Sequence, residues 1–192
     1  VYDKQVIIEH LNEHGWVVIP NILSQEKINK SKEFVKEFQN GIENYDKVHN
    51  SIDPHGIHKY HNAGHTRMAW LIRTDENVQK VFKDVWNTDE LIVSFDGFCY
   101  INKECAKKDN IWTHTDQAPN DKELLKCYQG FVALTENKER TLVVYDKSHL
   151  LHKKYFEDRK IESNKNWQLI EHNYLKEIQD SKRILEVPSG SL

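Results

Sequence analysis

The hydrophobic positions at the start of the chain follow a helix, a strand and a second helix. Asp3 can cap a helix whose apolar residues recur at helical spacing until Gly15 ends it. Residues 16–20, WVVIP, form a short β-branched run closed by proline, which is typical of a strand. Ser24 can cap a second amphipathic helix that runs to about Gly41. The chain is therefore predicted to open helix, strand, helix.

The clearest helical stripe lies in residues 74–89. Its apolar side chains fall at i, i+3, i+4, i+7 and i+8, and they are Val78, Val81, Phe82, Val85 and Trp86. This spacing puts all of them on one face of a helix. We expect that face to pack on the core.

Residues 45–66 show no hydrophobic period and are predicted to form a long loop. The segment is rich in Gly, Pro and Asn, and its five histidines are His49, His55, His58, His61 and His65. Their irregular spacing matches neither a zinc finger nor an H-E-x-x-H helix. The cluster therefore indicates at most an adventitious metal site.

Strand-like segments dominate the second half of the chain. They are residues 91–101, 111–116, 127–135, 141–146 and 183–187. One or two short helices or loops are expected between residues 150 and 179. A helical leader followed by strands predicts an α+β, mainly β fold, with helices packed outside an antiparallel sandwich or barrel.

Composition narrows the class of protein. The 192 residues suit one domain, and 38% hydrophobic with 30% charged residues is typical of a chain that folds with a very polar surface. The formal net charge of -3 gives no general reason to bind nucleic acid. No apolar run is long enough to cross a bilayer, so a membrane partner is not expected either.

The cysteines indicate a reducing compartment. Cys99, Cys105 and Cys127 are odd in number and contain no C-x-x-C pair, so neither a disulfide framework nor a zinc ribbon is indicated. The start of the chain is an amphipathic helix with acidic residues and does not have the pattern of a signal peptide. We therefore expect a cytoplasmic protein.

The most informative short segment is WTHTDQ, residues 112–117. On a strand, His114 and Asp116 at i and i+2 point to the same face. Together they can supply two corners of the 2-His-1-carboxylate triad that leaves positions on Fe(II) open for an oxoacid and O2. The alternative is that the triplet is a chance pairing of a surface histidine with an acid.

Longer segments resemble the phytanoyl-CoA dioxygenase family in order and spacing. They are GWVVIPNILSQEKI (15–28), LIVSFDGFCYIN (91–102), WTHTDQ (112–117) and CYQGFVALTENKERTLVVYDKSHLLHKKYF (127–156). The resemblance covers nearly the whole chain. It implies that the fold is a double-stranded β-helix, a cupin-like jelly roll with N-terminal helices packed outside. It also implies that the protein is a non-haem Fe(II), 2-oxoglutarate-dependent dioxygenase. Such an enzyme would hydroxylate a small aliphatic substrate with O2, with ascorbate as reductant.

The resemblance also assigns roles to residues. His114 and Asp116 correspond to the first two iron ligands, and Gln129 lies on the strand that contributes a side chain beside 2-oxoglutarate. Gln129 is either a donor to that carboxylate or an ordinary cross-strand polar residue. The family's third ligand is a histidine on a strand after a Pro-x-Gly-type turn, and residues 188–192 are where that strand would begin. Residues 1–192 are therefore expected to be a single dioxygenase-like domain truncated before its last core strands.

Other histidines and other functions remain as alternatives. His149 matches a residue that braces a loop in the family, and His152 and His172 are expected to be solvent-exposed on helical segments. Fold does not imply activity, so a non-catalytic binding module on the same fold is the main rival. A zinc hydrolase using the same ligands is less favoured because no general base is evident beside them.

Overall fold

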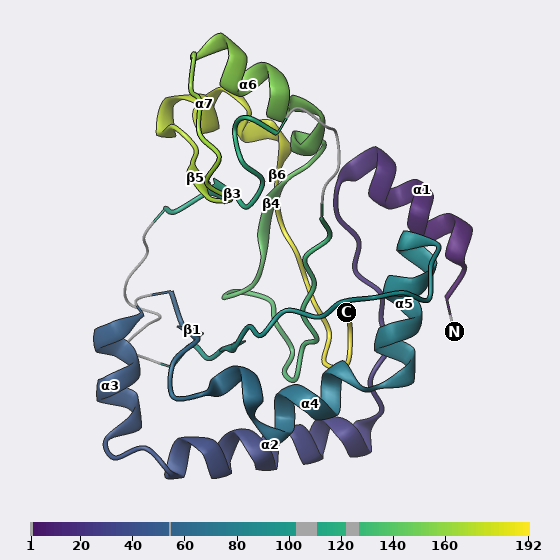
Figure 1. The fold of residues 1–192 in the computed structure, drawn as a ribbon, viewed down its shortest axis with the longest axis vertical. Helices are drawn as coiled ribbons and strands as arrows, with labels where there is room; N and C mark the ends of the chain where they lie inside the picture. The colour runs from purple at the N-terminus through teal and green to yellow at the C-terminus, as the bar shows by residue number, and fades with distance from the viewer. Residues whose placement is uncertain (1, 54, 103–110, 122–126) are drawn as a thin grey trace.

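The computed structural model describes residues 2–53, 55–102, 111–121 and 127–192 (Figure 1). Its first part is helical. The helices there are α1 (Lys4–His14), α2 (Gln25–Asn40), α3 (Tyr45–Ile52), the 3-10 turn η1 (Ala63–His65), α4 (Arg67–Arg73) and α5 (Glu76–Trp86). Helices α2 and α4 pack together, and α5 contacts both α1 and α4.

The second part consists of short strands and short helices. They are β1 (Ile57–His58), β2 (Phe98–Cys99), β3 (His114–Thr115), β4 (Val143–Tyr145), η3 (Ser148–Leu151), α6 (His152–Asp158), β5 (Gln168–Leu169), α7 (His172–Glu177), η4 (Gln179–Ser181) and β6 (Lys182–Ile184). Figure 1 shows α6, α7, β3 and β5 grouped at one end, α2, α3 and α4 at the opposite end, and β4 beside β6 between them.

The local signals at the helix ends act as the sequence predicts. The Asp3 carboxylate accepts hydrogen bonds from the backbone N–H groups of the first turn of α1, and Gly15 ends that helix at φ 81°. The Ser24 hydroxyl accepts from the Lys27 N–H at the start of α2. The predicted helices after Asp3, after Ser24 and over residues 74–89 are confirmed, as are the short helices expected between residues 150 and 179.

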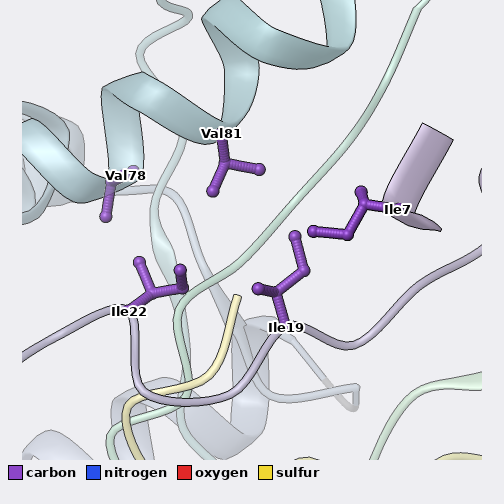
Figure 2. Packing of buried hydrophobic residues seen from close by; sticks show 5 residues of the cluster. All are labelled: Ile7, Ile19, Ile22, Val78 and Val81. Carbon is purple, nitrogen blue, oxygen red and sulfur yellow. The ribbon is translucent and has the colours of Figure 1, made fainter. Parts of the chain in front are cut away.

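The extended segment 16–20 lies between two clusters of buried side chains. On one side α1 and α5 contribute to a cluster made of Ile7, Ile19, Ile22, Val78 and Val81 (Figure 2). On the other side Trp16 and Val18 pack on Ala133, Leu185 and Val187. Alternate residues therefore face opposite clusters, as on a strand. Ile19 also exchanges two backbone hydrogen bonds with Leu192, at 2.9 and 3.0 Å.

The prediction of a long loop at residues 45–66 is wrong. This stretch contains α3, β1 and η1. The cause is that His49 and His58, treated as polar loop residues, are fully buried aromatic rings. They stack on each other with ring centroids 5.3 Å apart and on Tyr45 at 5.4 Å each. Once His49 counts as apolar, Tyr45, Val48, His49 and Ile52 show a helical period.

The strands are shorter than the sequence predicts. Within the described residues they form three separate two-stranded antiparallel sheets, β1–β2, β3–β5 and β4–β6. Residues 91–97 belong to no strand there, and Ile92 and Phe95 are exposed. Segment 127–135 is tied at Ala133, which bonds to Ser191 and Gly190. The double-stranded β-helix therefore stays a prediction.

Two further sequence expectations concern membranes and cysteines. None of the helices in the described part of the chain has the length and apolarity that crossing a bilayer requires. Neither Cys99 nor Cys127 forms a disulfide in the part of the chain that the structure describes. Cys105 lies outside the described residues.

Candidate metal site

His114 and Asp116 lie where the chain leaves β3. Strand β3 pairs antiparallel with β5, with His114 opposite Leu169, and the Ile170 N–H extends the ladder by donating to the Thr113 carbonyl at 2.9 Å. The strand ends at Thr115, so Asp116 occupies the bend that follows it. The His114 Nε2 and the Asp116 Oδ1 nevertheless face each other at 3.6 Å, and the two side chains are 21% and 39% exposed.

The orientation of the His114 imidazole is fixed at its other nitrogen. Its Nδ1 lies 2.8 Å from the Trp112 carbonyl oxygen. A carbonyl only accepts, so Nδ1 carries the hydrogen and Nε2 of the neutral ring presents a lone pair. That lone pair is turned toward the Asp116 carboxylate. Two acceptors that face each other in this way can share a donor or hold a cation between them.

Aromatic rings surround this histidine. The centroid of the Trp112 ring lies 4.7 Å from that of His114, and the Trp167 ring lies 5.4 Å from it. His55 stacks on Trp112 at 3.9 Å with an interplanar angle of 11°. One member of the predicted histidine loop therefore reaches the candidate site through Trp112. The sequence did not indicate Trp167 or His55 as neighbours of this site, because neither belongs to the WTHTDQ segment.

The turn after Asp116 is held by the segment that contains α6 and α7. Asn120 and Ser163 exchange hydrogen bonds, from the Asn120 N–H to the Ser163 carbonyl at 3.0 Å and from the Ser163 N–H to the Asn120 Oδ1 at 2.8 Å. The His152 Nε2 donates to the Ala118 carbonyl at 3.0 Å. The expectation that His152 is simply exposed is therefore wrong, because it is half-buried and braces this turn.

The donor pair has the chemistry that a divalent cation needs. Imidazole nitrogen and carboxylate oxygen suit zinc and the 2-His-1-carboxylate sites of non-haem Fe(II). Two ligand atoms at right angles, each about 2.1 Å from one ion, lie about 3 Å apart. The observed 3.6 Å is a few tenths of an ångström wider, which a rotation of the half-exposed Asp116 carboxylate can close. No group of three or more His, Cys, Asp or Glu side chains able to hold a metal occurs in the part of the chain that the structure describes.

Gln129 lies exposed in the extended segment 127–135. Its neighbour Tyr128 packs against Trp86 of α5, with ring centroids 4.8 Å apart. Two residues before Gln129, the pKa of the Cys127 thiol is raised, first by partial burial and then by the negative charges of Asp116 and Asp121. Cys127 is thus near enough to Asp116 to interact with it. In extended chain Gln129 points to the same side as Cys127.

The remaining histidines lie elsewhere. The Nε2 of His149 donates to the Asn12 carbonyl at 2.9 Å and so braces the end of α1, a structural role of the kind expected for it. His172 begins α7 and is exposed.

Comparison with known proteins adds one relative. No family model matches the chain, and no solved structure matches it. The chain is 28% identical over 142 residues to the Ava biosynthesis cluster protein O of Aspergillus versicolor, an alignment that covers 67% of this chain and 45% of that protein. The chain thus spans less than half the length of this curated relative. Its name refers to a biosynthesis cluster and specifies no reaction.

Proposed function

We propose that this chain belongs to a non-haem Fe(II), 2-oxoglutarate-dependent dioxygenase that resembles phytanoyl-CoA dioxygenases and hydroxylates a small aliphatic substrate with O2. The observation that carries the proposal is the facing pair of His114 Nε2 and Asp116 Oδ1, 3.6 Å apart. The order and spacing of the family-like segments support it further. We expect the protein to act in the reducing cytoplasm, where its cysteines stay free.

His114 and Asp116 would hold the iron through one nitrogen and one oxygen. Bound Fe(II) would supply the activation of O2, coupled to the oxidation of 2-oxoglutarate to succinate and CO2. The residues of this chain orient that chemistry. In the neutral ring the Trp112 carbonyl selects the tautomer with hydrogen on Nδ1, which leaves the His114 Nε2 lone pair for a metal, and the Asp116 carboxylate supplies a negative charge.

Gln129 is the proposed contact for 2-oxoglutarate. Its side-chain amide can donate a hydrogen bond to a carboxylate. It lies in the same extended segment as Cys127, whose thiol interacts with Asp116. Gln129→Ala is expected to weaken 2-oxoglutarate binding by about 1.5–3 kcal/mol, the value of a hydrogen bond to a charged group. Metal affinity should change much less, because the amide is no metal ligand in this proposal.

Metal binding is the first test, and the chain offers a matched control. His14 and Asp146 form a second histidine–carboxylate pair at 2.8 Å, in which the same Asp146 Oδ1 also accepts from the Trp16 Nε1. Titration calorimetry with Fe(II) under anaerobic conditions is expected to show binding that His114→Ala or Asp116→Ala abolishes. The control variant His14→Ala should bind the ion like the unsubstituted chain, since that pair already has its hydrogen bonds.

Turnover is the second test. Succinate is measured after adding Fe(II), ascorbate, 2-oxoglutarate and air, in this chain and in a longer protein that contains it. Slow succinate release without substrate is expected from the longer protein, which can supply the third ligand, and His114→Ala and Asp116→Ala should remove it. If the longer, iron-loaded protein releases no succinate and His114→Ala leaves its 2-oxoglutarate binding unchanged, the non-catalytic binding module becomes the better account.

A further inference from the structure

Trp167 is placed over His114 by a part of the chain far from it in sequence. It directly precedes β5, the strand that pairs with β3. Its ring centroid is 5.4 Å from that of His114, with a tilt of 31°, and Trp112 lies on the same imidazole at 4.7 Å. Yet Trp167 is 46% exposed, so the position is not explained by burial of the indole alone.

The segment that carries Trp167 is anchored on both sides of it. On the N-terminal side, Ser163 and Asn164 are hydrogen-bonded to Asn120, the Asn120 Nδ2 donating to the Asn164 Oδ1 at 2.9 Å. On the C-terminal side the β3–β5 ladder continues to the Ile170 N–H. Every one of these bonds is made to residues 113–121, which contain His114 and Asp116. The backbone on both sides of Trp167 is therefore held to the segment that carries His114, and the indole lies 5.4 Å from the imidazole.

This arrangement controls the rotation of the imidazole. The Nδ1 bond to the Trp112 carbonyl holds one edge of the ring. That bond is lost if the side chain swings about its Cα–Cβ bond, a movement that also turns Nε2 away from Asp116. The Trp112 and Trp167 rings, centred 4.7 and 5.4 Å from the imidazole, fill space beside it that such a swing would need.

We infer that Trp167 is a positioning residue for His114: its indole keeps the imidazole in the rotamer and tautomer that present the Nε2 lone pair beside the Asp116 carboxylate. The use of this geometry for metal binding rests on the proposed function. The geometry itself does not depend on the proposed function, and it can be measured in the absence of metal.

The test combines the tautomer of His114 with metal affinity. Long-range 1H–15N NMR spectra of the chain labelled at histidine are expected to show His114 with hydrogen on Nδ1 alone. Trp167→Ala should give a mixture of tautomers and weaken binding of Co(II), which prefers similar ligands to Fe(II), by roughly tenfold. Trp167→Phe should restore both properties, because a phenyl ring can cover the same face. Trp70→Ala is the matched control, since Trp70 is 38% exposed on α4 and its ring partners are His65 and Phe95.

The outcomes separate this inference from the proposed function. An unchanged Nδ1–H tautomer in a folded Trp167→Ala variant overturns the inference. If that variant does not fold, nuclear Overhauser contacts between the Trp167 and His114 rings in the unsubstituted chain decide it, and their absence overturns the inference. A third outcome is possible, in which the Trp167 and His114 rings are in contact and Trp167→Ala changes the tautomer, but the unsubstituted chain does not bind Co(II). That outcome would support Trp167 as a positioning residue and refute the metal site.

Discussion

Acid should destabilise the fold through one buried histidine, His58. Its side chain is fully buried, and its Nδ1 lies 2.9 Å from the Tyr45 hydroxyl. Its Nε2 has no hydrogen-bond partner among the described residues. A proton added to this ring would place a charge in a stack of Tyr45, His49 and Phe98, away from water.

The pKa of His58 is accordingly lowered from 6.5 to about 4. Burial is the largest cause, followed by the nearby charges that His49 and His61 can carry, while a backbone hydrogen bond with Tyr60 and the charge of Asp53 oppose the shift. The Tyr45 hydroxyl stays protonated throughout, because burial raises its pKa to about 12. The relevant pH window therefore lies between 6.5 and about 4.

The sign and size of the effect follow from proton linkage. In the unfolded chain His58 has a pKa of 6.5 and binds a proton below that pH, whereas in the folded chain it stays neutral down to about pH 4. Protons therefore favour the unfolded chain in this window, and stability falls as the pH falls. Between about pH 7.5 and about pH 5 this one group should lower the free energy of unfolding by about 2 kcal/mol. The full effect at lower pH is about 3 kcal/mol.

Urea unfolding at several pH values measures this slope. His58→Phe keeps an aromatic ring in the stack, and although it leaves the Tyr45 hydroxyl unpaired, that loss is the same at every pH in this window. Between about pH 7.5 and about pH 5, the free energy of unfolding of the variant should fall by about 2 kcal/mol less than that of the unsubstituted chain. His172→Gln changes an exposed histidine and should keep the slope. Equal slopes for His58→Phe and the unsubstituted chain would refute the reasoning.

Three further substitutions and two control substitutions test the packing around α1 and α5 by chemical denaturation. Gly15→Ala should lower the free energy of unfolding by about 1–2 kcal/mol, because φ at Gly15 is +81° and an added Cβ would lie 2.4 Å from the His149 ring. The control Gly41→Ala should be nearly neutral, because Gly41 has an ordinary helical φ. Asp146→Ala removes an acceptor shared by two side chains and should cost about 1–3 kcal/mol. Val81→Ala in the core should lower the free energy of unfolding by about 2 kcal/mol. The control Val6→Ala, at an exposed position, should lower it by less than about 0.5 kcal/mol. Equal losses in the two variants would contradict the described packing.

Helices α1, α2 and α5 were predictable because their signals are local. The capping residues Asp3, Gly15 and Ser24 each act on the adjacent helical turn. The hydrophobic stripe of α5 is complete within its eleven residues. The strands were not predictable to the same degree, because a strand requires a partner. Segment 91–97 has the composition of a strand and no ladder in the described residues. Its exposed Ile92 and Phe95 show that β propensity is no substitute for pairing.

The candidate site was predictable to the extent that it lies in one segment. The i, i+2 spacing of His114 and Asp116 brings their side chains together even though β3 ends between them. Trp167 and His55 were missed because tertiary packing brings them to His114 and Trp112. The burial of His49 and His58 was missed for a chemical reason. A neutral imidazole packs as an aromatic ring, which a polar assignment of histidine overlooks.

The pairing of segment 16–20 with the far end of the chain has a consequence for synthesis. Ile19 bonds to Leu192, the His14 carbonyl accepts from the Lys147 N–H, and Trp16 packs on Leu185. These partners are translated more than a hundred residues after the segment that needs them. During that interval the face of segment 16–20 that carries Trp16 and Val18 is open to any chaperone or neighbouring nascent chain, and loop closure over such distances is slow. Newly made protein is therefore expected to depend on chaperones until residues 185–192 have emerged.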